Sequence, residues 1–330
     1  MSDRRKEGEE KMAKAIFISA DCWLCVFDLL PASQLGLGIA MISYRFDFYV
    51  DEHFKTRRWT MSYMEIKSKF EADGTVGMDI VNYGGKALPI PQNPLPKKVV
   101  GFKAISIKYF NNNAIAFLGN FRQLFATCPI NLTIDTFKDM ELILRNIWPM
   151  IATNICAIQL SASFFRYLRE FVPSFLNDCP SLRIINAYDY GFFTKFPADD
   201  SANASNGQAL AKWLFTPRPD NVPKVLKCWL YMNSGKWSST IEDFKSTFAN
   251  ASSPVNFIAI IYFPNGFFSV VPFDQTNELT QEQLTLKEVN DIDRVLLIRC
   301  PIVRDESKWA KWEKEAIGWN FMDQWNRIDI

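Results

Sequence analysis

The fold is decided by residues 155–187, ICAIQLSASFFRYLREFVPSFLNDCPSLRIINA. The two ends of this stretch, 155–160 and 182–187, each place apolar residues in the pattern apolar-x-x-apolar-x-apolar, which is typical of a short buried strand. The segment between them carries an apolar stripe at steps of four, three and four residues: Phe164, Leu168, Phe171 and Phe175. This spacing predicts a helix with one buried face. The stretch therefore predicts a strand–helix–strand unit with parallel strands.

The same unit recurs along the chain. Strand-like blocks centre on residues 105, 132, 158 and 185, at steps of 27, 26 and 27, and later blocks centre on residues 228 and 258. A helical stripe lies between consecutive blocks up to residue 185, and a last strand is expected at 294–302. This alternation predicts an α/β fold with a mostly parallel sheet and right-handed crossovers. A nearly constant step indicates stacked repeats.

The strand blocks resemble a degenerate leucine-rich-repeat array. They keep the L-x-x-L-x-L frame of that family and lack the asparagine that closes its motif. The resemblance implies a repeat-like α/β substrate-binding domain over residues 99–330. Near its end, Trp309, Trp312, Ala316 and Trp319 recur at helical spacing. We expect this helix to cap the open edge of the array.

Residues 57–98 have a different pattern. Segments 59–67 and 78–81 alternate between polar and apolar residues, and Asp73-Gly74 between them is a turn signal. The proline-rich segment 88–96 follows, and proline is excluded from paired central strands. This part of the chain is expected to form antiparallel strands, as a small β-meander, and a stiff connection.

The sequence predicts a short helical module at residues 14–56, after a charged lead-in at 1–13 that we expect to be disordered. An apolar stripe at steps of four and three residues marks the first helix: Ile18, Cys22, Val26 and Leu29. The helix is expected to end at Pro31, because proline cannot continue the hydrogen-bond ladder. A second apolar run follows at residues 35–42. A module of this size rarely buries an adequate core alone, which favours a partner or a neighbouring domain.

Three short motifs in this module resemble the F-box. Leu30-Pro31 matches the Leu-Pro pair that closes the first helix of that family. Ile18-Ser19 stands in place of the opening Leu-Pro, and Arg45-Phe46 in place of the basic-x-Trp that ends the third helix. The resemblance covers about forty residues and is similar to the expanded F-box families of nematodes, including plant-parasitic ones. A leucine-rich-repeat array often follows the F-box in such substrate adaptors.

The resemblance implies a substrate-recognition subunit of a Skp–cullin–F-box ubiquitin ligase. The module would bind the Skp-type adaptor and, through it, the cullin complex, while the repeat-like body would bind an unknown target protein. The implied adaptor-binding residues are Cys22, Val26, Phe27, Leu30, Pro31, Met41, Ile42 and Phe46. Two alternatives stay open: a non-enzymatic protein-binding repeat scaffold without a ligase link, and an enzyme with an unrecognised site.

Target binding is expected on one face of the array. In each strand the residue between two inward-pointing apolar residues points to the opposite face. The residues expected to bind the target are Thr133, Gln159, Asn186, Lys227, Trp229 and Tyr231. Exposed aromatic residues such as Trp229 and Tyr231 are the kind of anchor that protein interfaces use. Alternatively, a loop or helix covers them.

Composition argues against several kinds of partner. The net charge of +1 gives no reason to expect nucleic acid or an anionic membrane. Seven cysteines lie apart from one another in apolar runs, which is typical of reduced thiols and predicts a cytoplasmic or nuclear protein. Asp21 and Asp28 interrupt the first apolar run, so we expect neither a signal peptide nor a membrane span.

The sequence lacks the common catalytic and cofactor motifs. His53 is the single histidine, so the usual nucleophile triads cannot form. The pair Cys22-x-x-Cys25 has no second pair or histidine at zinc spacing. Neither G-x-x-x-x-G-K nor G-x-S-x-G is present. We therefore expect no enzymatic activity, no metal and no cofactor.

Overall fold

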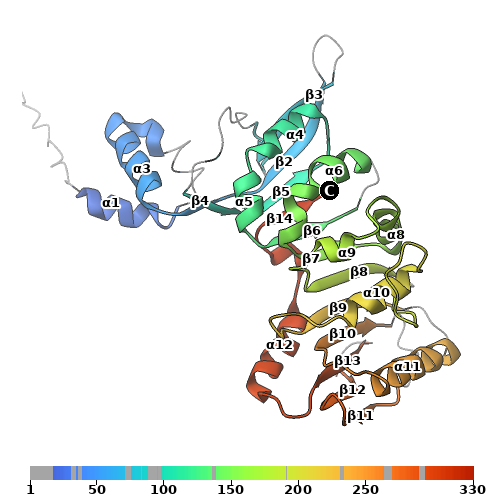
Figure 1. The fold of residues 1–330 in the computed structure, drawn as a ribbon. Coiled ribbons are helices and arrows are strands. Elements are labelled where there is room, and N and C mark those ends of the chain that lie inside the picture. The colour runs from blue at the N-terminus through green and yellow to red at the C-terminus, as the bar shows by residue number, and fades with distance from the viewer. Residues whose placement is uncertain are drawn as a thin grey trace, which may run out of the picture. The chain divides into compact units, whose positions relative to one another are not determined.

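The structure is a computed structural model of the chain. It describes residues 18–30, 35, 39–70, 76–82, 84–87, 95, 98–135, 139–190, 192–230, 234–263, 270–289 and 294–330. The chain divides into two compact units, unit 1 (residues 1–59) and unit 2 (residues 60–330) (Figure 1). No helix within the described ranges is long and apolar enough to cross a membrane.

Unit 1 is helical. It contains α1 (Ala20–Phe27), the 3-10 helix η2 (Ala40–Ile42) and α3 (Tyr44–Thr56). Serines start both α-helices: the side-chain oxygen of Ser19 accepts from the backbone N–H of Cys22, and that of Ser43 accepts from Phe46, as helix N-caps do. The expectation that a helix ends at Arg45-Phe46 is wrong, because Ser43 begins a new helix there.

Unit 2 is built on a twelve-stranded mixed sheet in the order β11-β12-β13-β10-β9-β8-β7-β6-β14-β5-β2-β3 (Figure 1). The strands are β2 (Met64–Phe70), β3 (Val76–Asn82), β5 (Ala104–Ile107), β6 (Ile130–Thr133), β7 (Ile155–Leu160), β8 (Ile184–Tyr190), β9 (Lys224–Trp229), β10 (Phe257–Tyr262), β11 (Phe273–Asn277), β12 (Glu282–Glu288), β13 (Arg294–Pro301) and β14 (Arg327–Asp329). From β10 through to β2 every neighbouring pair is parallel. The predicted α/β fold with a mostly parallel sheet is confirmed.

Helices connect the parallel strands. They are α4 (Asn112–Gly119), α5 (Arg122–Thr127), α6 (Met140–Asn146), α7 (Trp148–Ile151), α8 (Ala162–Phe171), α9 (Phe175–Asp178), α10 (Asn206–Leu214) and α11 (Ser234–Ala249), with the 3-10 turn η3 (Ala152–Asn154) before β7. After the sheet's last antiparallel strand come α12 (Glu306–Gly318) and the 3-10 turn η4 (Phe321–Asp323). The stripe predicted at 155–187 is divided between two helices: Phe164 and Leu168 are buried in α8, Phe171 ends α8 and is 48% exposed, and Phe175 is buried in α9.

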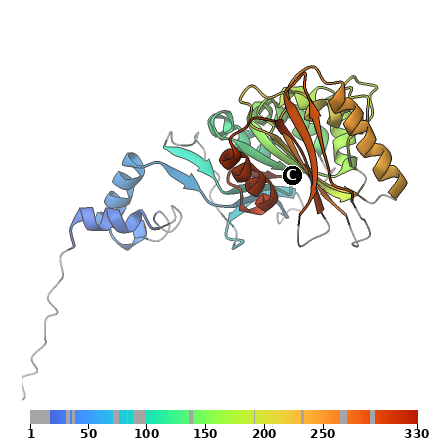
Figure 2. The ribbon, with the colours of Figure 1, turned by 90° about the horizontal axis from the view of Figure 1, so that it is seen from below.

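Two opposite faces of the sheet are covered by different helices. Phe257 of β10 contacts Phe244 of α11, with ring centroids 6.3 Å apart, whereas the next residue, Ile258, shares a core with Trp309 and Ala316 of α12. Side chains alternate along a strand, so α11 and α12 lie on opposite faces (Figure 2). The expectation that α12 caps the edge of the array is therefore wrong. Strands β13, β12 and β11 occupy that edge as antiparallel additions.

The N-terminal side of the sheet also departs from a simple stack of consecutive repeats. Strand β14 lies between β5 and β6, where Ile328 is in register with Ile105 and with Leu132. The antiparallel hairpin β2–β3 joins the same sheet, because β2 pairs with β5 in parallel. Strand β1 (Trp59–Met61) pairs separately with β4 (Val99–Phe102).

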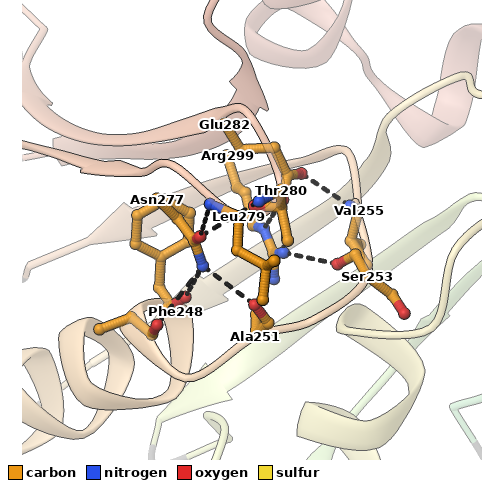
Figure 3. Close-up of polar contacts among 10 residues, drawn as sticks. Phe248, Ala251, Ser253, Val255, Asn277, Leu279, Thr280, Glu282 and Arg299 are labelled. Atoms are coloured by element: carbon orange, nitrogen blue, oxygen red, sulfur yellow. Dashed lines mark hydrogen bonds and ion pairs between the residues drawn. The ribbon is translucent and has the colours of Figure 1, made fainter.

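A buried polar cluster ties the antiparallel edge to α11 (Figure 3). Arg299 and Glu282 form an ion pair at 2.6 Å between Nη2 and Oε2, and both side chains are 1% exposed. The other carboxylate oxygen of Glu282 accepts from the backbone N–H of Val255 at 2.7 Å. Asn277 donates to the carbonyl of Phe248, at the end of α11, at 2.7 Å. These groups satisfy one another, so the cluster holds the edge strands in place.

Candidate functional site

A row of polar side chains crosses the sheet on the face that α12 partly covers. Strand pairing puts one residue from each of seven neighbouring strands in register. We call this set the polar row, and it consists of Glu65, Ser106, Asp329, Thr133, Gln159, Asn186 and Lys227. Four of the residues expected to bind a target, Thr133, Gln159, Asn186 and Lys227, are therefore on adjacent strands in register.

The middle of the polar row is half-buried. The side-chain amide of Asn186 donates to Oε1 of Gln159 at 2.8 Å, which fixes the orientation of both amides. Burial raises the pKa of the Asp329 carboxyl above its ordinary value. The charge of Arg327 and a hydrogen bond with Thr133 oppose part of this rise. Nε of Arg327 lies 2.9 Å from an Asp329 oxygen. This part of the row offers both donors and acceptors to an approaching polar chain.

Lys227 is the last residue of the polar row, and the chain at Trp319 covers it. The side chain is 6% exposed, and its ammonium donates to the carbonyl of Trp319 at 2.8 Å. Burial lowers the pKa of Lys227 to about 8, and Arg294 adds to the effect. The expectation that Lys227 faces the solvent is not met, because the chain after α12 crosses over it.

Trp229, one of the two aromatic residues expected to anchor a target, lies beside the polar row. Trp229 is half-buried and stacks on Tyr262, with ring centroids 4.7 Å apart and an interplanar angle of 19°. Stacked rings of this kind present a flat apolar surface beside the polar row. Tyr231 lies outside the described residues.

Unit 1 exposes many large apolar side chains. Among its described residues seven are more than a third exposed: Ile18, Val26, Leu29, Met41, Ile42, Tyr44 and Phe48. We call these seven the apolar surface of unit 1. Met41 and Ile42, which the F-box resemblance assigns to the adaptor, are 80% and 63% exposed. Cys22, also assigned to the adaptor, is exposed as well.

Other residues assigned to the adaptor face inward in unit 1. Phe27 is 1% exposed and forms the core with Leu35 and Val50. Leu30 and Phe46 are half-buried against that core. Pro31 lies outside the described residues.

The single histidine belongs to the interior of unit 1. His53 is 7% exposed, and its Nδ1 lies 4.0 Å from Asp28, which pairs with Arg57 at 2.9 Å. The pKa of His53 lies below its ordinary value, mainly because the ring is buried. The Asp28 carboxylate opposes this shift, and Arg57 adds to it. The ring of His53 packs edge-on against Phe27 at 5.8 Å between centroids. This environment stabilises a neutral imidazole as part of the packing.

Sequence reasoning missed two acidic residues of the polar row, Glu65 and Asp329. Asp329 lies on β14, which pairs with strands about 200 residues earlier in the chain, and Glu65 joins the row through the pairing of β2 with β5, so periodicity carried no signal for either residue. The described residues contain no group of three or more His, Cys, Asp or Glu placed to hold a metal ion. Burial raises the pKa of the Cys156 thiol to about 11, which does not favour a nucleophilic thiolate at neutral pH.

Comparison with known proteins adds no relative: no family model, no curated protein and no solved structure matches the chain. The features of the molecule that point to a function are the apolar surface of unit 1 and the polar row of unit 2.

Proposed function

We propose that the chain is the substrate-recognition subunit of a Skp–cullin–F-box ubiquitin ligase, acting in the cytoplasm or nucleus. Unit 1 binds the Skp-type adaptor, and unit 2 holds a target protein on the face that carries the polar row. One observation carries the proposal. Unit 1 leaves seven large apolar side chains exposed while only three, Phe27, Leu35 and Val50, are fully buried among its described residues.

The apolar surface of unit 1 supports a protein partner. Soluble proteins rarely leave several large apolar side chains of one small module in water unless the surface binds something. Met41 and Ile42 are neighbours in η2, and Val26 and Leu29 lie in and just after α1. These residues lie within the stretch of about forty residues that resembles the F-box. An adaptor that covers them would supply the core that a module of this size lacks.

The polar row supports target binding by unit 2. A leucine-rich-repeat-like sheet presents the residues between its inward-pointing apolar positions on one face, and here they lie in register across seven strands. The row is polar in its middle and has the stacked pair Trp229 and Tyr262 beside Lys227. A polar surface with one aromatic platform is suited to a protein interface.

The proposed role needs no bond chemistry from the chain itself. Holding a target on unit 2 while unit 1 is attached to the ligase raises the effective concentration of target lysines near the ubiquitin-charged enzyme.

Co-purification with a Skp-type adaptor tests the proposal. The wild-type chain is expected to retain the adaptor, and the double variant Met41→Asp, Ile42→Asp is expected to lose it, because two charges would enter the apolar contact. Val303→Asp is the matched control, since Val303 is 91% exposed in unit 2. Failure of the wild-type chain to bind any Skp-type adaptor, or equal binding by the double variant, contradicts the proposal.

The second candidate function is a protein-binding scaffold without a ligase link. It is favoured by the position of Arg45 and Phe46, which lie in the first turn of α3 and not at the end of a helix as in the F-box. The scaffold binds targets through unit 2 and no adaptor through unit 1, so the co-purification separates the two functions.

A further inference from the structure

Unit 2 contains a cavity that the proposed function does not use. It measures about 870 Å³ and lies where β6, β7, β8 and β9 begin, beside the last turns of α12 and the chain at 324–326. We call it the strand-start pocket. Its volume falls within the range of about 300–1,000 Å³ that is typical of small-molecule sites.

The pocket has an apolar floor and aromatic walls. Ile184, Val225 and Ala316 form the floor and belong to the core that joins α12 to the sheet. Trp319 and Trp325 line the pocket from the chain that follows α12. The apolar part of a ligand in this pocket would contact the flat rings of the two tryptophans and the apolar floor.

Hydrogen bonds hold both tryptophan segments in place. The amide of Asn131 donates to the carbonyl of Trp325 at 2.8 Å. The ammonium of Lys227 donates to the carbonyl of Trp319 at 2.8 Å. The walls are therefore anchored to strands of the sheet, so the pocket is formed before any ligand enters and binding requires little reorganisation.

The charged groups around the pocket are mostly positive. Arg183, Lys311 and Lys314 line it, with Glu315 as the one acidic lining residue among the described residues. Glu315 lies 3.9 Å from Lys311, whereas Lys314 forms no ion pair with any described residue. The opening thus attracts an anion.

Arg183 is the strongest anion-binding group in the pocket. It is half-buried, and its Nε donates to the carbonyl of Pro223 at 3.1 Å, which fixes the plane of the guanidinium. Its two terminal nitrogens have no hydrogen-bond partner among the described residues. A guanidinium fixed in this way binds a carboxylate through two parallel hydrogen bonds.

We infer that the strand-start pocket binds a small organic acid, with an apolar, ring-containing body on the floor between Trp319 and Trp325 and a carboxylate against Arg183 and Lys314. The site binds its ligand without converting it. This inference does not depend on the ligase proposal, because every residue that it uses lies in unit 2 and its test requires no adaptor.

The test compares two probes of equal shape and different charge, 2-naphthoate and naphthalene-2-carboxamide, by isothermal titration of the full-length chain. The acid is expected to bind at least about tenfold more tightly than the amide. The double variant Arg183→Gln, Lys314→Gln is expected to reduce this preference to about twofold or less, because both cations are lost. Lys314→Gln alone, at an exposed position, is expected to reduce it partly without affecting folding.

A variant that fills the pocket fixes the location of the ligand. Gly318 lines the cavity, and a Cβ built there meets no atom within 4 Å, so the backbone at this position accepts a side chain, and Gly318→Trp is designed to place a ring against the pocket. It is expected to weaken binding of both probes at least tenfold. Lys308→Gln, on α12 but outside the pocket lining, is the control and is expected to change nothing.

Three outcomes overturn the inference. In the first, 2-naphthoate does not bind at about 1 mM, the weakest affinity that such a site would have. In the second, acid and amide bind equally. In the third, Gly318→Trp binds the acid as well as the wild-type chain does, which would place the ligand elsewhere, such as on the apolar surface of unit 1.

Discussion

Units 1 and 2 bury their apolar residues in opposite ways. Unit 1 exposes Leu29 and Met41 by 83% and 80%, and its core is small. Unit 2 buries both faces of its central strands, so that five of the six residues of β9 and of β10 are buried. Unit 2 therefore has a complete core of its own, whereas unit 1 has an apolar surface that a second protein can cover.

The largest expected effect is in unit 2, at its buried ion pair. Glu282→Ala is expected to lower the free energy of unfolding of unit 2 by about 3–5 kcal/mol, because it leaves the cation of Arg299 buried without its partner. Chemical denaturation measures the change. The control is Glu242→Ala, whose side chain is 69% exposed and pairs with Lys245. It is expected to cost less than about 0.5 kcal/mol. Equal losses in the two variants would contradict the structural role of the cluster.

The next effect is in unit 1, at its core. Phe27→Ala is expected to destabilise unit 1 by about 3 kcal/mol, because it removes most of a side chain that is 1% exposed. Hydrogen exchange is expected to accelerate in α1 and α3 and to stay unchanged in the sheet of unit 2. Phe48→Ala, at a position 52% exposed, is expected to leave exchange unaltered. Faster exchange in both units after Phe27→Ala would show that they unfold together, contrary to this comparison.

The smallest effect is the pH dependence of unit 2. Burial, with a contribution from Arg218, lowers the pKa of Lys224 to about 7, and its ammonium donates to the carbonyls of Trp213 and Thr216. The unfolded chain keeps this proton up to about pH 10. Unit 2 is therefore expected to gain about 1.5 kcal/mol from Lys224 between pH 7 and 8.5, since the unfolded state binds more protons there, and Lys227, with a pKa of about 8, adds a smaller gain of the same sign.

Denaturation at several pH values measures this slope, and Lys224→Met is expected to remove most of it. The range ends near pH 8.5 because buried thiols act in the opposite direction above it. Burial raises the pKa of Cys156 and of Cys179, so unfolding releases their protons at alkaline pH. An identical slope in Lys224→Met would show that other groups cause the pH dependence.

Local periodicity was enough to predict the parallel part of the fold. Strands β6, β7 and β8 lie where the apolar-x-x-apolar-x-apolar blocks occur, since burial on one face follows directly from the side-chain alternation of a strand. Pairing between distant segments leaves no such signal. For this reason the position of β14 between β5 and β6, and the location of α12 on a face, could not be read from the sequence.

For the candidate site too, the sequence predicted the features that depend on local patterns and not those that depend on distant segments. Alternation placed Thr133, Gln159 and Asn186 on one face, because it depends only on the strand that carries them. The covering of Lys227 by Trp319 depends on the path of the chain 92 residues later, which no local pattern contains. The start of α3 did have a local signal, Ser43 with Asp47 in the first turn, which the F-box resemblance obscured.

Hydrogen–deuterium exchange of the full-length chain, with and without a Skp-type adaptor, tests whether unit 1 carries the surface that binds a partner. We expect the adaptor to slow exchange in η2 and in α1, where Met41, Ile42 and Val26 are exposed, and to leave the strands that carry the polar row unchanged. Unchanged exchange throughout unit 1, or slower exchange confined to unit 2, would contradict the claim that unit 1 carries the surface for a partner.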